Sequence, residues 1–250
     1  MNKEHIFLTP DQVLDAMCRD LRQYEPQIML LCEIAQTICG DHATIKRDPG
    51  SNRVWVRHAH KTGMQELDGA DMTEFVCDLI KSAKMDSKLL LSISGRVFQS
   101  RARTGTDPET GKPAICIETG MESYNCRQCG RCCRDLDYRN QLTARDVQRW
   151  RTAGRHDILK WVGITRRADG REAYSMWVIP GTTRISETCP FLEPGRQQHG
   201  TDAVWSCRIH DVKPDICRQY PINRKHATMT GCLGFENQIN GKAKHIKKMT

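Results

Sequence analysis

The chain has 250 residues, 38% of them hydrophobic, and a formal charge of +8. This length allows one large domain or two modest ones with buried cores. A mean hydropathy of −0.60 and the lack of any window near the ~18 apolar residues of a membrane helix exclude a membrane-spanning segment. The opening residues, MNKEHIFLTPDQ, do not resemble a secretory signal. We therefore expect a cytoplasmic protein with no membrane partner.

Much of the positive charge lies in three stretches, Arg145–Arg155, Arg166–Arg171 and Lys242–Lys248. A basic surface can bind nucleic acid or an acidic protein. Neither a recognition helix nor an aromatic RNA-binding pattern accompanies these stretches. A solvated surface is the favoured interpretation, and nucleic acid is a less favoured partner.

The first predicted elements are two helices within residues 9–39. Thr9 begins a capping box, and apolar residues then recur at helical spacing. Pro26 is expected to interrupt the helix and restart it. A cysteine on an apolar stripe behaves as a small buried hydrophobe. We therefore predict core positions, and no ligand role, for the three cysteines on these stripes: Cys18, Cys32 and Cys39.

A turn at residues 48–50 and a strand at 53–57 are predicted next. His58 and His60 follow on one side of an extended chain. No third metal ligand lies near them in the sequence, so we predict two surface histidines.

A helix over residues 72–84, capped by Asp71, follows this segment. Cys77 lies off the centre of its apolar stripe and has no obvious partner. A strand is predicted around residues 89–93.

Residues 100–113 are rich in turn formers and polar side chains, which predicts an exposed loop. Residues 114–118 then predict a strand, with Cys116 on the face opposite its two isoleucines. The mixture of helices and strands predicts an α+β region over residues 1–120, whose role the sequence does not reveal.

Beyond residue 120 the predicted elements become short. They are a helix capped by Thr143, a helical turn near 158–162 and a strand near 174–179, separated by loops rich in glycine, proline and cysteine. Such a region buries little apolar surface, so metal binding would supply part of its folding free energy. The predicted fold class is α+β, in which residues 121–250 form a loop-rich, metal-stabilised cysteine-cluster domain with a basic tail.

Thirteen cysteines are the most unusual feature of the composition. In a reducing compartment, such a number indicates metal ligation rather than disulfides. Eight of them fall in the last 125 residues, where we predict that they bind metal: Cys126, Cys129, Cys132, Cys133, Cys189, Cys207, Cys217 and Cys232.

The central motif is Cys-x2-Cys-x2-Cys-Cys over residues 126–133. Such spacing lets three thiolates converge while backbone N–H groups point at the sulfurs, which suits an iron–sulfur cluster. Gly130 permits a tight turn between the ligands. Three flanking cations would favour thiolate over thiol: Arg127, Arg131 and Arg134.

The remaining four cysteines lie at the ends of predicted elements. Cys189 precedes a proline, as the closing ligand of ferredoxin-type sites commonly does. Cys207 is predicted on a strand over 205–209, Cys217 on a short helix that begins at Pro214, and Cys232 in a turn.

Eight cysteines divide naturally into four plus four. The side chains of the adjacent Cys132 and Cys133 diverge, so we expect two sites, or one site and a structural remnant. Two [4Fe–4S] clusters fit this number, as does one cluster with a four-cysteine zinc site. Zinc alone is a further alternative, and disulfides or free thiols are the least favoured. Spacing alone does not assign the cysteines to sites.

These motifs resemble the YkgJ-type cysteine-cluster family, also described as the CxxCxxCC zinc- or iron-chelating domain. The resemblance covers about residues 121–235. It rests on the Cys126–Cys133 motif, Cys189-Pro-Phe-Leu, Cys207-x-Ile-His, and Lys213-Pro-x2-Cys217-Arg-x-Tyr-Pro. Lys213 stands where the family more often has arginine, and His210 where it often has tyrosine. The resemblance implies metal binding and little else.

One branch of that family resembles flagellin lysine N-methylases, which pair such a cluster with S-adenosylmethionine. No methyltransferase-like glycine loop and no Cys-x3-Cys-x2-Cys motif is evident here, so whether the protein is an enzyme stays open and its catalytic residues are unknown.

Three functions remain under consideration. The first is an iron–sulfur protein that acts in electron transfer or as an accessory factor, with an unknown redox or protein partner. The second is a methyltransferase-like enzyme that uses polar residues near the ligands, for which second-shell hydrogen bonding is the favoured alternative: Asp135, Asp137, Tyr138 and His210. The third is a zinc-stabilised module that binds protein or nucleic acid.

Overall fold

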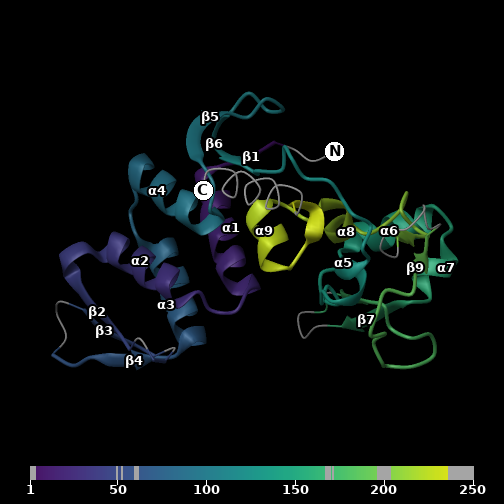
Figure 1. The fold of residues 1–250 in the computed structure, drawn as a ribbon, viewed down its shortest axis with the longest axis horizontal. Coiled ribbons are helices and arrows are strands. Elements are labelled where there is room, and N and C mark those ends of the chain that lie inside the picture. Colours follow the sequence, from purple (N-terminus) through teal and green to yellow (C-terminus); the bar gives the residue numbers. More distant parts are fainter. Residues whose placement is uncertain are drawn as a thin grey trace, which may run out of the picture. The chain divides into compact units, whose positions relative to one another are not determined.

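The structure is a computed structural model that describes residues 4–48, 50–51, 53–58, 62–166, 170, 172–195 and 204–235. Its contacts divide the chain into two compact units, Lys3–Glu122 and Ser123–Thr250. Both units combine helices with small antiparallel sheets, which confirms the predicted α+β class (Figure 1). Several sequence expectations lie outside the described residues: those for Pro49, His60, the side chain of His58, most of Arg166–Arg171, and Lys242–Lys248.

The first unit is helical at its centre and carries two three-stranded sheets. Its elements in chain order are β1 His5–Leu8, α1 Pro10–Gln23, α2 Ile28–Cys39, η1 Gly40–His42, β2 Ala43–Arg47, β3 Val54–His58, β4 Gln65–Leu67, α3 Gly69–Ser82, α4 Ser87–Phe98, β5 Ala102–Thr106 and β6 Pro113–Glu118.

Three of the four long helices, α1, α3 and α4, begin at a residue whose side chain caps the helix. Thr9 forms the predicted capping box of α1 with Gln12, and the break before α2 confirms two helices. The expected start of α3 was wrong by three residues, because Asp68 rather than Asp71 caps it. The strand expected around 89–93 was also wrong: Asp86 accepts a hydrogen bond from the N–H of Leu89 and begins α4.

Two cysteines lie in the main core cluster of the first unit, and a third, Cys116 of β6, is also fully buried. Cys18 of α1 and Cys77 of α3 are fully buried, and each thiol donates to the carbonyl of the other residue. Cys77 therefore lies within the core rather than at the margin of its helix stripe. Cys32 packs against the same core and is partly buried. Cys39 is partly buried as well, but it lies outside that core cluster, so its expected core position was wrong.

The two sheets of the first unit have the strand orders β1-β6-β5 and β2-β3-β4, both antiparallel. The exposed loop expected at 100–113 was only partly right, because its first half forms the edge strand β5. Thr104 of this strand pairs with Ile115. Its mostly exposed side chains lack the alternation that predicts a strand, so backbone pairing with β6 decides its conformation.

The second unit is built from short elements, as expected for a loop-rich region. They are α5 Arg131–Arg134, α6 Ala144–Thr152, α7 His156–Leu159, β7 Val162–Arg166, β8 Glu172–Met176, β9 Leu192–Pro194, β10 Trp205–Cys207, α8 Asp215–Gln219, α9 Arg224–Met229 and η2 Leu233–Phe235. Thr143 caps α6 as predicted. The strand expected at 174–179 begins two residues earlier and ends at Met176, because Trp177 adopts a positive φ of 57°. The strand expected at 205–209 ends at Cys207.

A small apolar core supports the second unit. Trp150, Ile158 and Phe191 are fully buried in it, and Cys189 and Cys207 pack against its edge. The indole N–H of Trp150 donates to the carbonyl of Val212 at 2.7 Å. This bond ties α6 to the segment that leads into α8, which carries Cys217.

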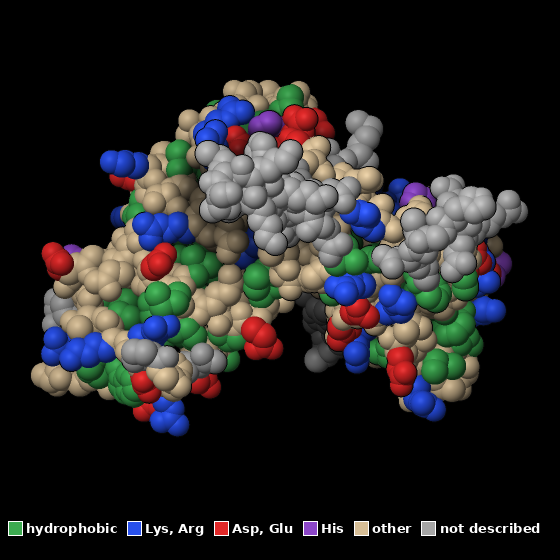
Figure 2. Space-filling view, in the orientation of Figure 1, with side chains coloured by type: hydrophobic (Ala, Val, Ile, Leu, Met, Phe, Trp, Pro, Cys, Tyr) green, Lys and Arg blue, Asp and Glu red, His purple; other side chains and the backbone are tan. Residues whose placement is uncertain are grey.

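Charged side chains of both signs are intermingled on the face shown in Figure 2. This distribution is typical of a solvated surface. No helix in the described part of the chain is long and apolar enough to cross a membrane.

Candidate metal centre

The cysteine motif forms a tight curl that ends in α5. Gln128 and Gly130 both adopt positive φ angles, 52° and 70°, and Cys133 donates its N–H to the carbonyl of Gly130. A Cβ on Gly130 would lie 2.9 Å from Trp205 Cγ. Glycine is therefore required there both by the left-handed backbone and by the close approach of the indole.

The remaining cysteines come to the motif from three other segments. The antiparallel pair β9–β10 holds Cys207 opposite Leu192, and the N–H of Cys189 donates to the carbonyl of Cys133 at 2.9 Å. Cys217 lies on α8. Cys232 follows α9, with its N–H bonded to the carbonyl of Ala227 at 2.8 Å.

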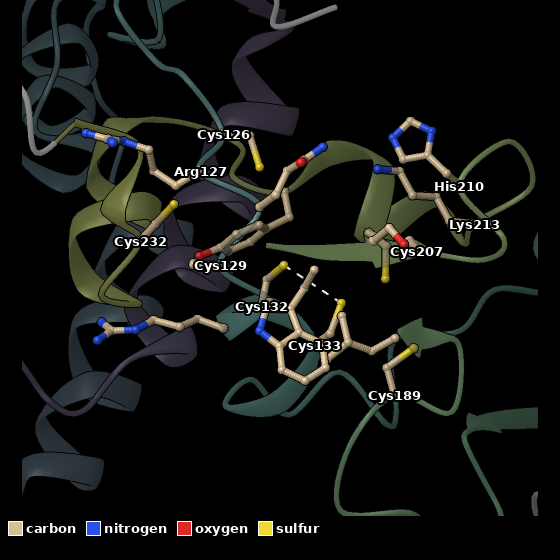
Figure 3. A pocket seen from close by; sticks show the side chains of 18 of the residues that line it. Cys126, Arg127, Cys129, Cys132, Cys133, Cys189, Cys207, His210, Lys213 and Cys232 are labelled. Carbon is tan, nitrogen blue, oxygen red and sulfur yellow. Dashed lines mark hydrogen bonds between the residues drawn. The ribbon is translucent and has the colours of Figure 1, made fainter. Parts of the chain in front are cut away.

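A single cavity of about 510 Å³ is lined by all eight cysteines that the sequence singled out. Figure 3 shows seven of them labelled around this space. Cys126 is exposed and the other seven are partly buried. The structure thus brings the eight residues together, while their role as ligands stays a prediction.

The thiols surround the cavity without closing on one point. The Sγ atoms of Cys132 and Cys133 lie 4.0 Å apart. Among the described residues, no group of three or more His, Cys, Asp or Glu side chains is close enough together to hold one metal ion. The donor set is nevertheless rich in soft thiol sulfur, which selects zinc, copper(I) and iron–sulfur clusters over hard cations.

The charge of the cavity wall is positive. The described residues that line it include no Asp or Glu, but they include Arg127, Arg131, His210 and Lys213. Lys213 electrostatically favours the thiolate forms of Cys132, Cys207 and Cys217. Cationic neighbours of this kind offset the charge of metal-bound thiolates.

The thiols in the interior hold their protons tightly. A hydrogen bond with Cys133, followed by burial, raises the pKa of the Cys132 thiol above its usual range. The hydrogen bond with Cys132 lowers the pKa of the Cys133 thiol. A hydrogen bond with Cys189 and burial act in the opposite direction and outweigh it, so the pKa rises to about 12. Burial is the main cause of the raised pKa values of Cys207 and Cys217. Metal binding must displace these protons, so affinity rises with pH.

Two tyrosines face the thiols as well. The hydroxyl of Tyr124 lies 3.6 Å from Cys232 Sγ. Burial is the main cause that raises the pKa of Tyr220, and the neighbouring thiols of Cys232 and Cys132 add to it. Sequence reasoning missed both tyrosines and Lys213 as wall residues. Lys213 and Tyr220 belong to the motif around Cys217, whereas no pattern in the sequence marks Tyr124.

The polar residues expected near the ligands separate into two groups. Tyr138 and His210 line the main cavity. Asp135 and Asp137 line a neighbouring pocket of about 180 Å³, which shares four cysteines with the first. Asp137 is paired with Arg139, 2.6 Å away. Of the three predicted flanking arginines, Arg134 lies over the Trp205 ring, 5.0 Å from its centroid.

Fold and site together define a cysteine-rich domain with a thiol-lined cavity. Residues 125–240 match the family model described as CxxCxxCC, "putative zinc- or iron-chelating domain", which confirms the predicted resemblance. This part of the chain is therefore similar to that domain family. No curated protein and no solved structure matches the chain.

Proposed function

We propose that this chain is an iron–sulfur protein that exchanges single electrons with a protein partner. The observation that carries the proposal is the cavity of about 510 Å³ that all eight cysteines line. When bound, an iron–sulfur cluster supplies reversible one-electron transfer.

The open volume supports a polynuclear cluster over single zinc ions. Zinc binds thiolate at about 2.3 Å in a tetrahedron, which draws its four sulfurs to about 3.8 Å from one another and leaves no space between them. An iron–sulfide core lies between its thiolates and fills such a space. The thiols of this chain surround a cavity, and the Sγ atoms of the adjacent Cys132 and Cys133 lie 4.0 Å apart.

The placement of the site supports electron exchange with a partner. Cys126 is exposed, so metal bound there lies close to the surface. Arg127 and Arg131 line the same cavity and reduce the electrostatic cost of adding an electron to an anionic cluster. A positive rim also attracts an acidic protein partner.

The chain's own residues would hold and shield the cluster. The thiolates bind it, while Trp177, Trp205 and Leu192 line the cavity with apolar surface and limit the access of water. Lys213 offsets the charge of the thiolates nearest to it.

Anaerobic purification followed by measurement of iron, acid-labile sulfide and zinc on one sample tests the proposal. We expect near-equal iron and sulfide at about four or eight per chain, with broad visible absorption that a one-electron reductant bleaches reversibly. A colourless protein with about one or two zinc ions per chain would overturn it. Iron that is lost on the first reduction cycle would contradict the electron-transfer role.

A further inference from the structure

The neighbouring cysteines of α5 differ in their surroundings. Successive residues of a helix leave its axis about 100° apart, although the Sγ atoms of Cys132 and Cys133 lie 4.0 Å from each other. The carbonyl of Cys133 accepts a hydrogen bond from the N–H of Cys189 at 2.9 Å.

A first group of thiols gathers around Cys133. The N–H of Leu192 donates to the carbonyl of Cys189, and Leu192 pairs across the β9–β10 ladder with Cys207, so these two cysteines come from one hairpin. Cys217 on α8 lines both the cavity and the neighbouring pocket, as do Cys132, Cys133 and Cys189. Figure 3 shows the sulfurs of Cys133, Cys189 and Cys207 on the same side of the cavity.

A second group forms where the start of the motif meets the end of the domain. Asn125 donates its N–H to the carbonyl of Gly234 at 3.1 Å, and Arg131 Nη1 donates to the carbonyl of Gly231 at 3.0 Å. The ring of Tyr124 packs on Gly234 so closely that a Cβ there would meet it at 2.2 Å.

These contacts bring Cys232 to Tyr124, which stands two residues before Cys126. The Tyr124 hydroxyl lies 3.6 Å from Cys232 Sγ, and both cysteines line the cavity. Cys129 sits between Cys126 and Cys132 on the same curl of backbone and lines the same cavity.

We propose that the eight cysteines form two separate four-thiolate centres, with Cys132 in one and Cys133 in the other. The first centre takes the thiols around the β9–β10 hairpin and α8: Cys133, Cys189, Cys207 and Cys217. The second takes the thiols held between the motif and residues 231–235: Cys126, Cys129, Cys132 and Cys232. This division rests on the proposed binding of metal by the cysteines, but it holds for zinc as for iron–sulfur.

The division places the two centres in series. Cys126 is the exposed cysteine, so the second centre is the one that meets solvent and a redox partner. The 4.0 Å between the sulfurs of Cys132 and Cys133 joins it to the first centre, whose Cys217 is partly buried on α8. Electrons would therefore enter and leave through the second centre.

Metal content in alanine variants tests the division. Cys126→Ala and Cys189→Ala should each retain half of the wild-type metal. The pair within one centre, Cys126→Ala with Cys232→Ala, should lose no more than Cys126→Ala alone. The pair across centres, Cys126→Ala with Cys189→Ala, should lose nearly all. Cys39→Ala, outside the site, is the control and should retain all of the metal.

A second measurement uses the wild-type protein, so it does not depend on how the variants fold. A chelator removes metal in steps, and iodoacetamide with mass spectrometry identifies the cysteines freed at each step. We expect alkylation of Cys126, Cys129, Cys132 and Cys232 as one set, before the other four. Alkylation that mixes the two sets would overturn the division, as would half the metal remaining in the cross-centre variant.

The identity and amount of bound metal distinguish the two-centre division from the proposed iron–sulfur function. Two zinc ions per wild-type chain and one in each single variant would leave the division standing and overturn the iron–sulfur function. About eight iron atoms falling to about four would support both. A wild-type protein with a single centre would overturn the division alone.

Discussion

Replacement of Asp146 by alanine is expected to destabilise the cysteine-cluster unit and to lower its metal content. The carboxylate is fully buried at the third position of α6. One oxygen accepts from the hydroxyl of Thr143 at 2.6 Å and from its N–H at 3.2 Å. The other accepts from Arg149 at 2.7 Å and from the N–H of Asp215 at 2.9 Å. Asp146 thus joins the start of α6 to the start of α8.

The size of the effect follows from these four contacts. With alanine at position 146, the partly buried guanidinium of Arg149 would lose one carboxylate partner. The N–H groups of Thr143 and Asp215, at the starts of α6 and α8, would lose their acceptor. Removal of one partner from a buried, hydrogen-bonded ion pair costs about 3–5 kcal/mol. With a urea dependence of about 2 kcal/mol/M, the unfolding midpoint should fall by about 2 M. Cys217 follows on α8, so its centre should lose metal.

The assay is urea unfolding of the full chain, followed by tryptophan fluorescence. Four of the five tryptophans lie in the second unit, so the signal reports mainly on that unit. Asp157→Ala is the matched control, because its carboxylate pairs with Arg155 at 2.9 Å in a half-exposed position. This control should lose less than about 1 kcal/mol. Equal midpoints for the two variants would refute the reasoning.

Three further predictions concern the turn, the thiols and the core. Gly130→Ala should lose metal, because a left-handed alanine costs about 1–2 kcal/mol and its Cβ meets Trp205. The control, Gly181→Ala, has a φ of 76° with open space around it and should keep its metal. Equal metal content in the two variants would contradict the predicted clash. The raised pKa of Cys133, about 12 against an ordinary 9.0, means that the metal-free folded state holds this proton more tightly than the unfolded chain; its contribution to stability is therefore complete below pH 9 and is lost as the pH rises toward 12. Urea unfolding at stepped pH should show this loss in metal-free protein and not in metal-loaded protein, and a parallel loss in both would count against it. Cys77→Ala should lower the free energy of unfolding by about 1–2 kcal/mol through a small cavity without any change in metal content, whereas lost metal would show that the first unit shares in the site.

Much of the candidate site could be predicted from the sequence, because thiol ligands must occur as cysteines at short, regular spacings. The motif at 126–133 and the proline after Cys189 indicated a metal domain, and all eight residues line one cavity. The helix caps at Thr9 and Thr143 were also readable, since capping depends on residues three apart in the chain. Local rules of this kind act within one or two turns and need no tertiary contacts.

Other features depend on contacts between residues that are distant in the chain. The polar strand β5 exists because β6 pairs with it, and residues 89–93 are helical because Asp86 caps α4 while Leu90 and Ile93 bury one face. No local pattern places Tyr124 against Cys232, 108 residues later. The sequence by itself determined which residues offer thiols to a metal. Only the tertiary structure decided which of them face one another, because hydrogen bonds and packing between distant segments set those distances.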